Sequence, residues 1–381
     1  MKLTKLYLEF FNSEKAGGLI LLIATALSLM LANTHLGSDY AAVWKTEIGG
    51  HSIVHWINDG LMAVFFLLIG LELEREIYRG ELSGVRNALL PLFAAVGGML
   101  IPAGIYILFN YGSPSLSGAG IPMATDIAFA LGILSVLGKR VPSSLKIFLT
   151  ALAVIDDLGS ILVIAIFYTS SLAFTDLFIA LGLFCLLLVL NKLRVNNLIP
   201  YLLGGLCIWY FLSLSGVHPA ITGILLAFAI PFGDGKEKSP SYRLQHFLHK
   251  PVAFLILPLF ALANTCIPLA AEWQHNLFGT MSLGIILGLV AGKPLGILLF
   301  SFLSVKAGIT SLPQGLTWRN LAGAGMLGGI GFTMSIFIAF LAFSDPALID
   351  SAKISILIAS LLSAVAGLSF LTISRRKSDA E

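Results

Sequence analysis

Long apolar segments follow one another along the chain, and only short polar stretches separate them. Each segment has about the 20 residues that an α-helix needs to cross the hydrocarbon core of a bilayer. The polar stretches are too short for a folded soluble domain, so we expect residues 1–381 to form a single all-α polytopic membrane domain. The pattern predicts twelve membrane spans, at about 16–33, 56–78, 89–110, 121–138, 144–169, 174–191, 198–212, 216–231, 248–266, 281–304, 321–343 and 350–373.

The composition agrees with this pattern. Hydrophobic residues make up 57% of the chain and charged residues only 11%, whereas an average soluble domain has roughly 25% charged residues. The composition therefore excludes a soluble globular domain. We expect the lipid bilayer as a partner of the chain, and no nucleic acid.

Basic residues fall in alternate loops between the predicted spans. Lysine and arginine in short loops concentrate on the cytoplasmic side of a membrane. The loops of one side hold 20 of the 23 basic residues, and this bias predicts that both termini are cytoplasmic. These residues are Lys2, Lys5, Lys15, Arg75, Arg79, Arg86, Lys139, Arg140, Lys146, Lys192, Arg194, Lys236, Lys238, Arg243, Lys250, Lys306, Arg319, Arg375, Arg376 and Lys377.

Glycine and proline interrupt the fourth and eleventh predicted spans, in the stretches GAGIPMATDIAFALGIL and AGAGMLGGIGFTMSIFIAF. Interruptions at corresponding positions of two halves indicate broken helices and an ion site near the midplane of a transporter. The two interrupted spans belong to three-span units at about 89–169 and 281–373, which start on opposite sides of the membrane. We therefore expect inverted-topology repeats, with the two broken helices at their centres.

A polar stretch at about 44–55 lies in the first outer loop. Its Gly49-Gly50 pair stands between short segments suited to strands, which is a signal of a two-residue β-hairpin. The alternative is an irregular loop. A hairpin here would offer an edge for pairing with another copy of the chain.

Four charged residues lie deep within predicted spans: Asp126, Asp156, Asp157 and Lys293. Such residues cost between about 2.5 and more than 10 kcal/mol in a membrane, so they are rare and usually functional. Asp126 suits a helix cap at a break, where it would neutralise positive helix ends while Lys293 neutralises negative ones. This role is compatible with a contribution of Asp126 to an ion site.

Two of these four charged residues, Asp156 and Asp157, are adjacent in the sequence. Lys293 can neutralise one of them in an ion pair, and neighbouring helix positions point about 100° apart. The other acid is then either protonated or bound to a cation. Burial and a nearby like charge favour the protonated form, and hard cations prefer oxygen ligands. The doublet therefore predicts a site at which sodium and protons compete.

A charged group also stands at the cytoplasmic end of the second predicted span, where Glu72, Arg75 and Glu76 follow one another closely. His246 and His249 fall on the same side and can titrate near neutrality. The group is either a solvated interfacial cluster or a funnel that gathers cations. For His218, near an outer helix end, we expect a packing role.

With these residues identified, the chain closely resembles the NhaA-type sodium/proton antiporters, and the resemblance covers essentially its whole length. The matching stretches are WINDGLMAVFFLLIGLELERE, IPMATDIAFALGIL, LKIFLTALAVIDDLGSILVIAIFY, SGVHPAITG, PLFALANT, GLVAGKPLGI and GGIGFTMSIFIAFLAF.

This resemblance implies a secondary active transporter of the bacterial inner membrane and no enzyme. It implies electrogenic exchange of more than one external proton for each internal sodium or lithium ion, by alternating access, in the service of sodium and pH homeostasis. No cofactor is implied besides the transported ions. The fourth and eleventh spans would cross as broken helices, and the outer hairpin would join two protomers into a homodimer.

The resemblance also implies roles for individual residues. Asp157 would be the principal sodium and proton ligand, Asp156 its partner, and Thr125 an assistant of the site. Asp126 and Lys293 would balance the dipoles of the broken helices, and a proton-carrying role of Lys293 stays open beside this structural one.

The cytoplasmic residues Glu72, Arg75, Glu76, His246 and His249 would take part in the response to pH. One position departs from the family pattern, because Gln245 stands where members typically carry a glutamate. We therefore expect pH control with a shifted profile.

Other classes of membrane protein also place acids in spans. An intramembrane aspartyl protease needs two acids that face each other across a cleft and a GxGD signature, whereas the doublet here is adjacent. A sodium-coupled symporter or a passive cation channel is the closer alternative. A channel needs weak binding at several sites along a pore, and one deep titratable pair instead favours alternating access.

Overall fold

A computed structural model describes residues 14–80, 83–137, 142–168, 172–269 and 273–378 of the chain. Of the basic residues used above to predict the orientation, Lys2, Lys5, Lys139 and Arg140 lie outside the described residues. The cytoplasmic placement of the termini therefore stays a prediction.

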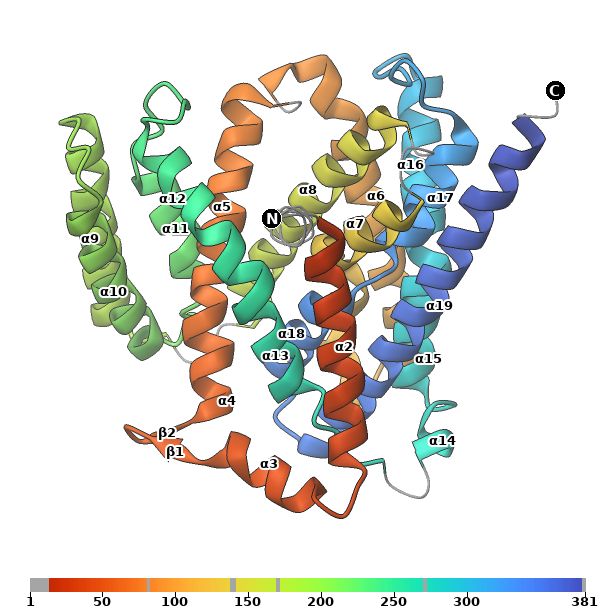
Figure 1. The fold of residues 1–381 in the computed structure, drawn as a ribbon, viewed down its shortest axis with the longest axis horizontal. Helices are drawn as coiled ribbons and strands as arrows, with labels where there is room; N and C mark the ends of the chain where they lie inside the picture. The colour runs from red at the N-terminus through yellow and green to blue at the C-terminus, as the bar shows by residue number, and fades with distance from the viewer. Residues whose placement is uncertain (1–13, 81–82, 138–141, 169–171, 270–272, 379–381) are drawn as a thin grey trace, which may run out of the picture. The chain divides into compact units, whose positions relative to one another are not determined.

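The described chain is mostly helical and carries one small hairpin of β1 and β2 (Figure 1). It divides into two compact units. The first unit consists of Met1–His35, Gly84–Ser160 and Asn264–Glu381. Its main elements are α2 (Glu14–Ala32), α6 (Val85–Asn110), η3 (Pro114–Met123), α7 (Ile127–Val136), the greater part of α8 (Ser143–Phe167), α14 (Trp273–Asn276), α15 (Thr280–Leu287), η6 (Gly288–Gly292), α16 (Lys293–Lys306), α17 (Trp318–Gly328), α18 (Phe332–Ala342) and α19 (Pro346–Ser378).

The second unit consists of Leu36–Ser83 and Ile161–Ala263. Its elements are α3 (Gly37–Lys45), β1 (Glu47–Ile48), β2 (His51–Ser52), α4 (Ile53–His55), η1 (Trp56–Leu61), α5 (Met62–Arg79), α9 (Phe174–Lys192), α10 (Leu198–Ser215), α11 (Ile221–Ala229), α12 (Pro240–Pro251), η5 (Val252–Ile256) and most of α13 (Leu257–Asn264).

The helices are long and apolar enough for an all-α polytopic membrane protein, as the sequence predicts. Within the described ranges, eight helices meet the length and hydropathy of a membrane span, or up to eleven if each bent helix pair counts as one span. The predicted span at 216–231 contains only the nine-residue α11, which follows a loop at 216–220. The twelve-span arrangement therefore stays a prediction.

Two helix pairs of the first unit are bent at short breaks. η3 and α7 are bent by 45°, and α17 and α18 by 46°. The first break is extended, since Ala124 has φ −78° and ψ 152°, and the second contains Gly329 and Gly331. The backbone N–H of Asp126 donates to the carbonyl of Ile330 at 2.7 Å, so the two breaks lie side by side.

A hairpin occupies part of the stretch at 44–55. β1 and β2 pair antiparallel, with Glu47 opposite Ser52 and Ile48 opposite His51. Gly49 and Gly50 have φ values of +63° and +87°, the left-handed conformation that a tight two-residue turn of this kind requires. The pairing of this hairpin with a second copy stays a prediction.

The helices α6 and α16 pack closely through two glycines. A Cβ atom on Gly97 would overlap the backbone carbonyl of Gly296, and a Cβ on Gly296 would overlap that of Gly97. Backbone atoms cannot move aside as a flexible side chain can. This contact fixes the position of α16, which begins with Lys293.

We predict that Gly97→Ala destabilises the protein, because the added methyl group forces α6 and α16 apart at a cost of about 1–3 kcal/mol. The matched control is Gly104→Ala in the same helix, where the new Cβ meets no atom within 4 Å. Thermal unfolding in detergent, followed by the loss of the monodisperse peak in size-exclusion chromatography, measures both variants. Equal midpoints for the two variants would contradict this account of the packing.

Candidate functional site

The four deeply placed charged residues of the sequence lie together in the first unit. Asp156, Asp157 and Lys293 are fully buried, and Asp126 is 2% exposed. Charges in such an interior must be compensated by one another or by hydrogen bonds, because no water is available to solvate them. Their partners therefore define the site.

Lys293 compensates two negative groups at once. Its Nζ lies 2.7 Å from Oδ2 of Asp156 and donates a hydrogen bond to the carbonyl of Met123. Met123 is the last residue of η3, so its carbonyl belongs to the negative end of a helical segment. Lys293 thus joins α8, α16 and the first break.

The Thr125 hydroxyl lies within hydrogen-bond distance of two acceptors. Its Oγ1 lies 2.8 Å from Oδ2 of Asp156 and 2.8 Å from the carbonyl oxygen of Gly328, the last residue of α17. A threonine hydroxyl has one hydrogen, and an ionised carboxylate and a carbonyl both need it. If Asp156 carries a proton, that proton can bond to Thr125, whose own hydrogen is then available to Gly328. The protonation of Asp156 therefore decides how well the Gly328 carbonyl is satisfied.

Asp126 caps two helices. Its Oδ1 accepts from the backbone N–H of Phe129 at 2.9 Å, as an N-cap of α7. Its Oδ2 accepts from the backbone N–H of Thr333 at 3.1 Å and from the Thr333 hydroxyl, in the first turn of α18. One carboxylate thus neutralises the positive ends of both half-helices.

Asp157 follows Asp156 in α8 and has no exposed surface. Because neighbouring helix positions point about 100° apart, the two carboxylates leave the helix in different directions. Lys293 pairs with Asp156. The doublet therefore separates a carboxylate that is held in an ion pair from one that faces another part of the interior.

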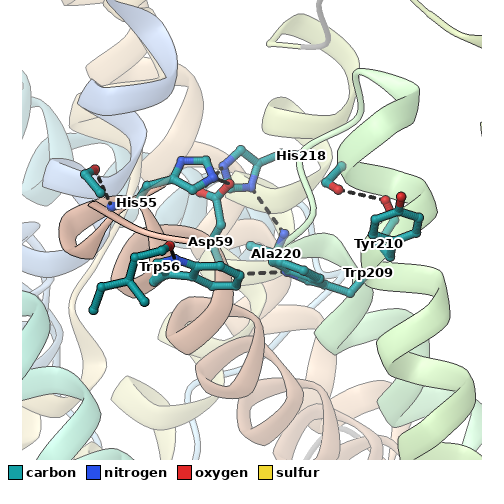
Figure 2. A network of polar contacts seen from close by, with 10 residues as sticks. His55, Trp56, Asp59, Trp209, Tyr210, His218 and Ala220 are labelled. Carbon is teal, nitrogen blue, oxygen red and sulfur yellow. Dashed lines mark hydrogen bonds and ion pairs between the residues drawn. The ribbon is translucent and has the colours of Figure 1, made fainter. Parts of the chain in front are cut away.

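A second polar cluster lies in the second unit, around Asp59 (Figure 2). Nε2 of His55 lies 3.4 Å from Oδ2 of Asp59, and Nε2 of His218 lies 3.6 Å from Oδ1. Nδ1 of His218 accepts from the backbone N–H of Ala220 at 3.3 Å, which leaves the ring hydrogen on Nε2, facing the carboxylate. We expected only a packing role for His218; its contact with Asp59 is an additional polar one.

The residues predicted to respond to pH lie on α5 and α12 of the second unit. Nδ1 of His249 lies 3.8 Å from Oε1 of Glu72. The Arg75 guanidinium lies 5.4 Å from the centroid of the Tyr242 ring, and the His246 ring stacks on the same Tyr242 ring with 6.1 Å between the centroids. Glu76 is carried on α5 with them. The structure thus brings predicted residues of both helices into contact.

Several polar contacts of this region do not stand out in the sequence. Thr333 lies 207 residues from Asp126 along the chain, and Ser360 of α19 accepts from the backbone N–H of Phe332 at 3.1 Å, at the start of α18. In the second unit, the buried Glu74 accepts from Ser241 at 3.2 Å. Serine and threonine are common in spans, so nothing local marks these positions as partners of a buried charge or of a backbone group at a break.

Comparison with known proteins gives a consistent result across the chain. The family model described as Na+/H+ antiporter 1 matches residues 8–371. The protein Na(+)/H(+) antiporter NhaA 1 of Flavobacterium johnsoniae is 62% identical over 371 residues, which are 97% of this chain and 97% of that protein. The NhaA antiporter of Flavobacterium psychrophilum is 60% identical and covers 96% of both chains. That of Cytophaga hutchinsonii is 57% identical and covers 99% of this chain and 97% of its own.

We predict that Thr333→Val destabilises the protein by about 1.5–3 kcal/mol, because it removes a donor from the buried carboxylate of Asp126. Thr333→Ser, which keeps the hydroxyl, should restore most of the loss. The control is Ser363→Ala, since the Ser363 hydroxyl is buried and has no hydrogen-bond partner among the described residues. Thermal unfolding in detergent measures all three; a Thr333→Val protein as stable as the wild type would contradict the capping role.

Proposed function

Because the chain belongs to the NhaA-type Na⁺/H⁺ antiporter family, we propose that it is an electrogenic exchanger that expels Na⁺ or Li⁺ from the cell and admits more than one external H⁺ per ion. The chain is a multi-pass membrane transporter, not a catalytic enzyme. We place it in the bacterial inner membrane with cytoplasmic termini, where it would serve sodium and pH homeostasis. Transport proceeds by secondary active alternating access.

The observation that carries this proposal is the buried acid doublet with a single lysine. Asp157 is the principal ligand of Na⁺ and H⁺, Asp156 is its partner, and Thr125 assists the site. Lys293 lies 2.7 Å from Asp156 and pairs with it, so an incoming cation binds first to Asp157. Asp156 becomes available to the cation when its ion pair with Lys293 loosens. Carboxylates that hold a proton cannot also bind Na⁺, and this competition makes the site an exchanger.

The same arrangement supports exchange of more than one proton. The two adjacent carboxyl groups of Asp156 and Asp157 behave as a coupled pair, so Na⁺ binding at the doublet displaces more than one proton. Two protons moving inward against one sodium ion moving outward transfer one net charge per cycle. Within this cycle, Asp126 and Lys293 also balance the ends of the half-helices that meet at the breaks.

The proposal includes a region of α5 and α12 that responds to pH. Glu72, Arg75, Glu76, His246 and His249 form the region through which pH controls transport. The contact between Nδ1 of His249 and Oε1 of Glu72 at 3.8 Å supports a shared role of α5 and α12 in this region. Gln245 in place of an acid shifts the pH profile without abolishing control.

We propose a homodimer joined through β1 and β2. An edge strand offers backbone N–H and carbonyl groups with which a strand of a second copy can pair. The exposed Ile48 supplies an apolar side chain for such a contact.

The competing classes are less well supported. An aspartyl protease needs two acids that share one water molecule across a cleft, whereas Asp156 and Asp157 are neighbours on one helix and one of them is held by Lys293. A symporter or a passive channel does not need a deeply buried proton-binding pair.

We predict that proteoliposomes loaded with Na⁺ take up protons when they are diluted into sodium-free buffer, with no organic substrate present. A potassium diffusion potential set by valinomycin should accelerate the exchange when the interior is negative. A pH-sensitive dye inside the vesicles records the uptake. Sodium efflux without proton uptake would contradict antiport and favour the channel.

We predict that Asp157→Asn abolishes the exchange and leaves the protein folded, because an amide can neither carry the proton nor supply a charged ligand. Asp39→Asn, an exposed position in the first turn of α3, is the matched control and should transport normally. Full exchange by Asp157→Asn would contradict the role of this carboxylate.

In the wild type, the sodium concentration at half-maximal rate should rise as the pH falls, because more carboxylates then carry protons. The rise should approach about tenfold per pH unit for each proton that one sodium ion displaces. Initial rates at several fixed pH values measure this dependence, and a half-maximal concentration independent of pH would contradict competition.

A further inference from the structure

Ser160 is a buried hydroxyl beside the acid doublet. The residue lies in α8, has 1% of its surface exposed, and its Oγ has no hydrogen-bond partner among the described residues. A serine within a helix commonly donates to the carbonyl three or four residues earlier. Leaving a buried hydroxyl unsatisfied costs free energy, so a group that binds this oxygen in some state of the protein would remove that cost.

The position of Ser160 on the helix directs it to the doublet. It follows Asp157 by three residues and Asp156 by four, and both spacings make neighbours on a helix surface. With about 100° per residue, Ser160 lies in projection between the two acids, about 40° from Asp156 and about 60° from Asp157. Because helix side chains tilt toward the N-terminus, its hydroxyl extends toward the turn that carries both carboxylates.

A sodium ion at the doublet needs more oxygen atoms than two carboxylate groups supply. In the part of the chain that the structure describes, no three His, Cys, Asp or Glu side chains are placed to share a metal ion. Further ligands must therefore be hydroxyl groups, backbone carbonyls or water. Oδ1 of Asp156, on the same turn, also has no hydrogen-bond partner among the described residues.

We propose that Ser160 is a further ligand of the transported ion, with its Oγ coordinating Na⁺ between the carboxylates of Asp156 and Asp157. This inference rests on the exchange function proposed above. The hydroxyl is suited to both loaded states, since its lone pairs bind the sodium ion and its hydrogen or lone pairs bond a protonated carboxyl group. As a neutral oxygen it contributes to sodium affinity without adding a negative charge that would also attract protons.

Sodium and lithium should differ in their dependence on this ligand. The smaller Li⁺ ion is satisfied by fewer oxygens, whereas the larger Na⁺ ion has room for more, and ligand number is one basis of selectivity between cations. Loss of the Ser160 oxygen should therefore weaken sodium binding more than lithium binding.

The test compares four variants. Ser160→Ala removes the oxygen, and Ser160→Cys keeps the shape but replaces the oxygen with a soft sulfur atom. Ser160→Thr keeps the hydroxyl. The matched control is Ser301→Ala, because the Ser301 hydroxyl is equally buried and without a hydrogen-bond partner among the described residues, but lies two helical turns beyond Lys293.

Two measurements are made on each protein after size-exclusion chromatography confirms that it is folded: equilibrium binding of radioactive sodium in detergent at alkaline pH, and exchange in proteoliposomes. We expect Ser160→Ala and Ser160→Cys to raise the sodium dissociation constant and half-maximal concentration roughly tenfold. The maximal rate should stay within about twofold of the wild type, as expected for loss of a binding contact. Ser160→Thr, which keeps the oxygen ligand, should recover most of the affinity that Ser160→Ala loses, and Ser301→Ala should bind sodium like the wild type.

Unchanged sodium affinity in Ser160→Ala would overturn the inference. So would wild-type affinity in Ser160→Cys, because the side chain would then act through its shape, and an equal loss in Ser301→Ala would show a general effect of buried hydroxyls. The binding arm separates this result from a failure of the proposed function. A wild-type protein that binds sodium but does not exchange it for protons would contradict antiport and leave the dependence of binding on Ser160 to decide the inference.

Discussion

The structure of the first unit depends on the neutralisation of charges that have no access to water. Lys293 neutralises Asp156 and the end of η3, and Asp126 neutralises the starts of α7 and α18. A break in a membrane helix exposes backbone groups that must find partners inside the protein. The two breaks are possible at the same place because charges of opposite sign are supplied there by side chains. Removal of Lys293 would leave Asp156 and the end of η3 buried without a positive partner, and removal of Asp126 would leave the starts of α7 and α18 without a negative one.

Because neighbouring residues of a helix point in different directions, we propose that the two acids of the doublet have different roles. Asp156 takes part in the charge balance with Lys293. In the exchange that we propose, Asp157, about 100° away around the helix, gives up its proton with less disturbance of that balance. Thr125 couples these roles, since its single hydroxyl hydrogen lies between Asp156 and the carbonyl of Gly328. A proton on Asp156 would therefore change the hydrogen bonding of the second break. A site of this kind can link its occupancy to the conformation of the helices that surround it.

The sequence reveals part of this arrangement because charge and hydropathy are local properties. Apolar segments predict the membrane helices, and a charged residue within such a segment, such as Asp126 or Lys293, can be recognised as a candidate functional residue. Hydroxyl partners such as Thr333 and Ser360 cannot be recognised in this way, because serine and threonine in a span usually bond their own helix. Contacts across more than 200 residues, such as Asp126 with Thr333, depend on the tertiary fold. The predicted span at 216–231 contains only the short α11 for a different reason: hydropathy measures how apolar a segment is and not where its helix begins.

The proposed exchange depends above all on competition between sodium and protons for the same carboxylates. This competition is tested most directly by the protons that the purified protein releases when Na⁺ is added in a weakly buffered detergent solution with a pH indicator. We expect a saturable release of more than one proton per bound sodium ion at a pH where the carboxylates are protonated, and no release with K⁺. Saturable sodium binding without any release of protons would contradict it.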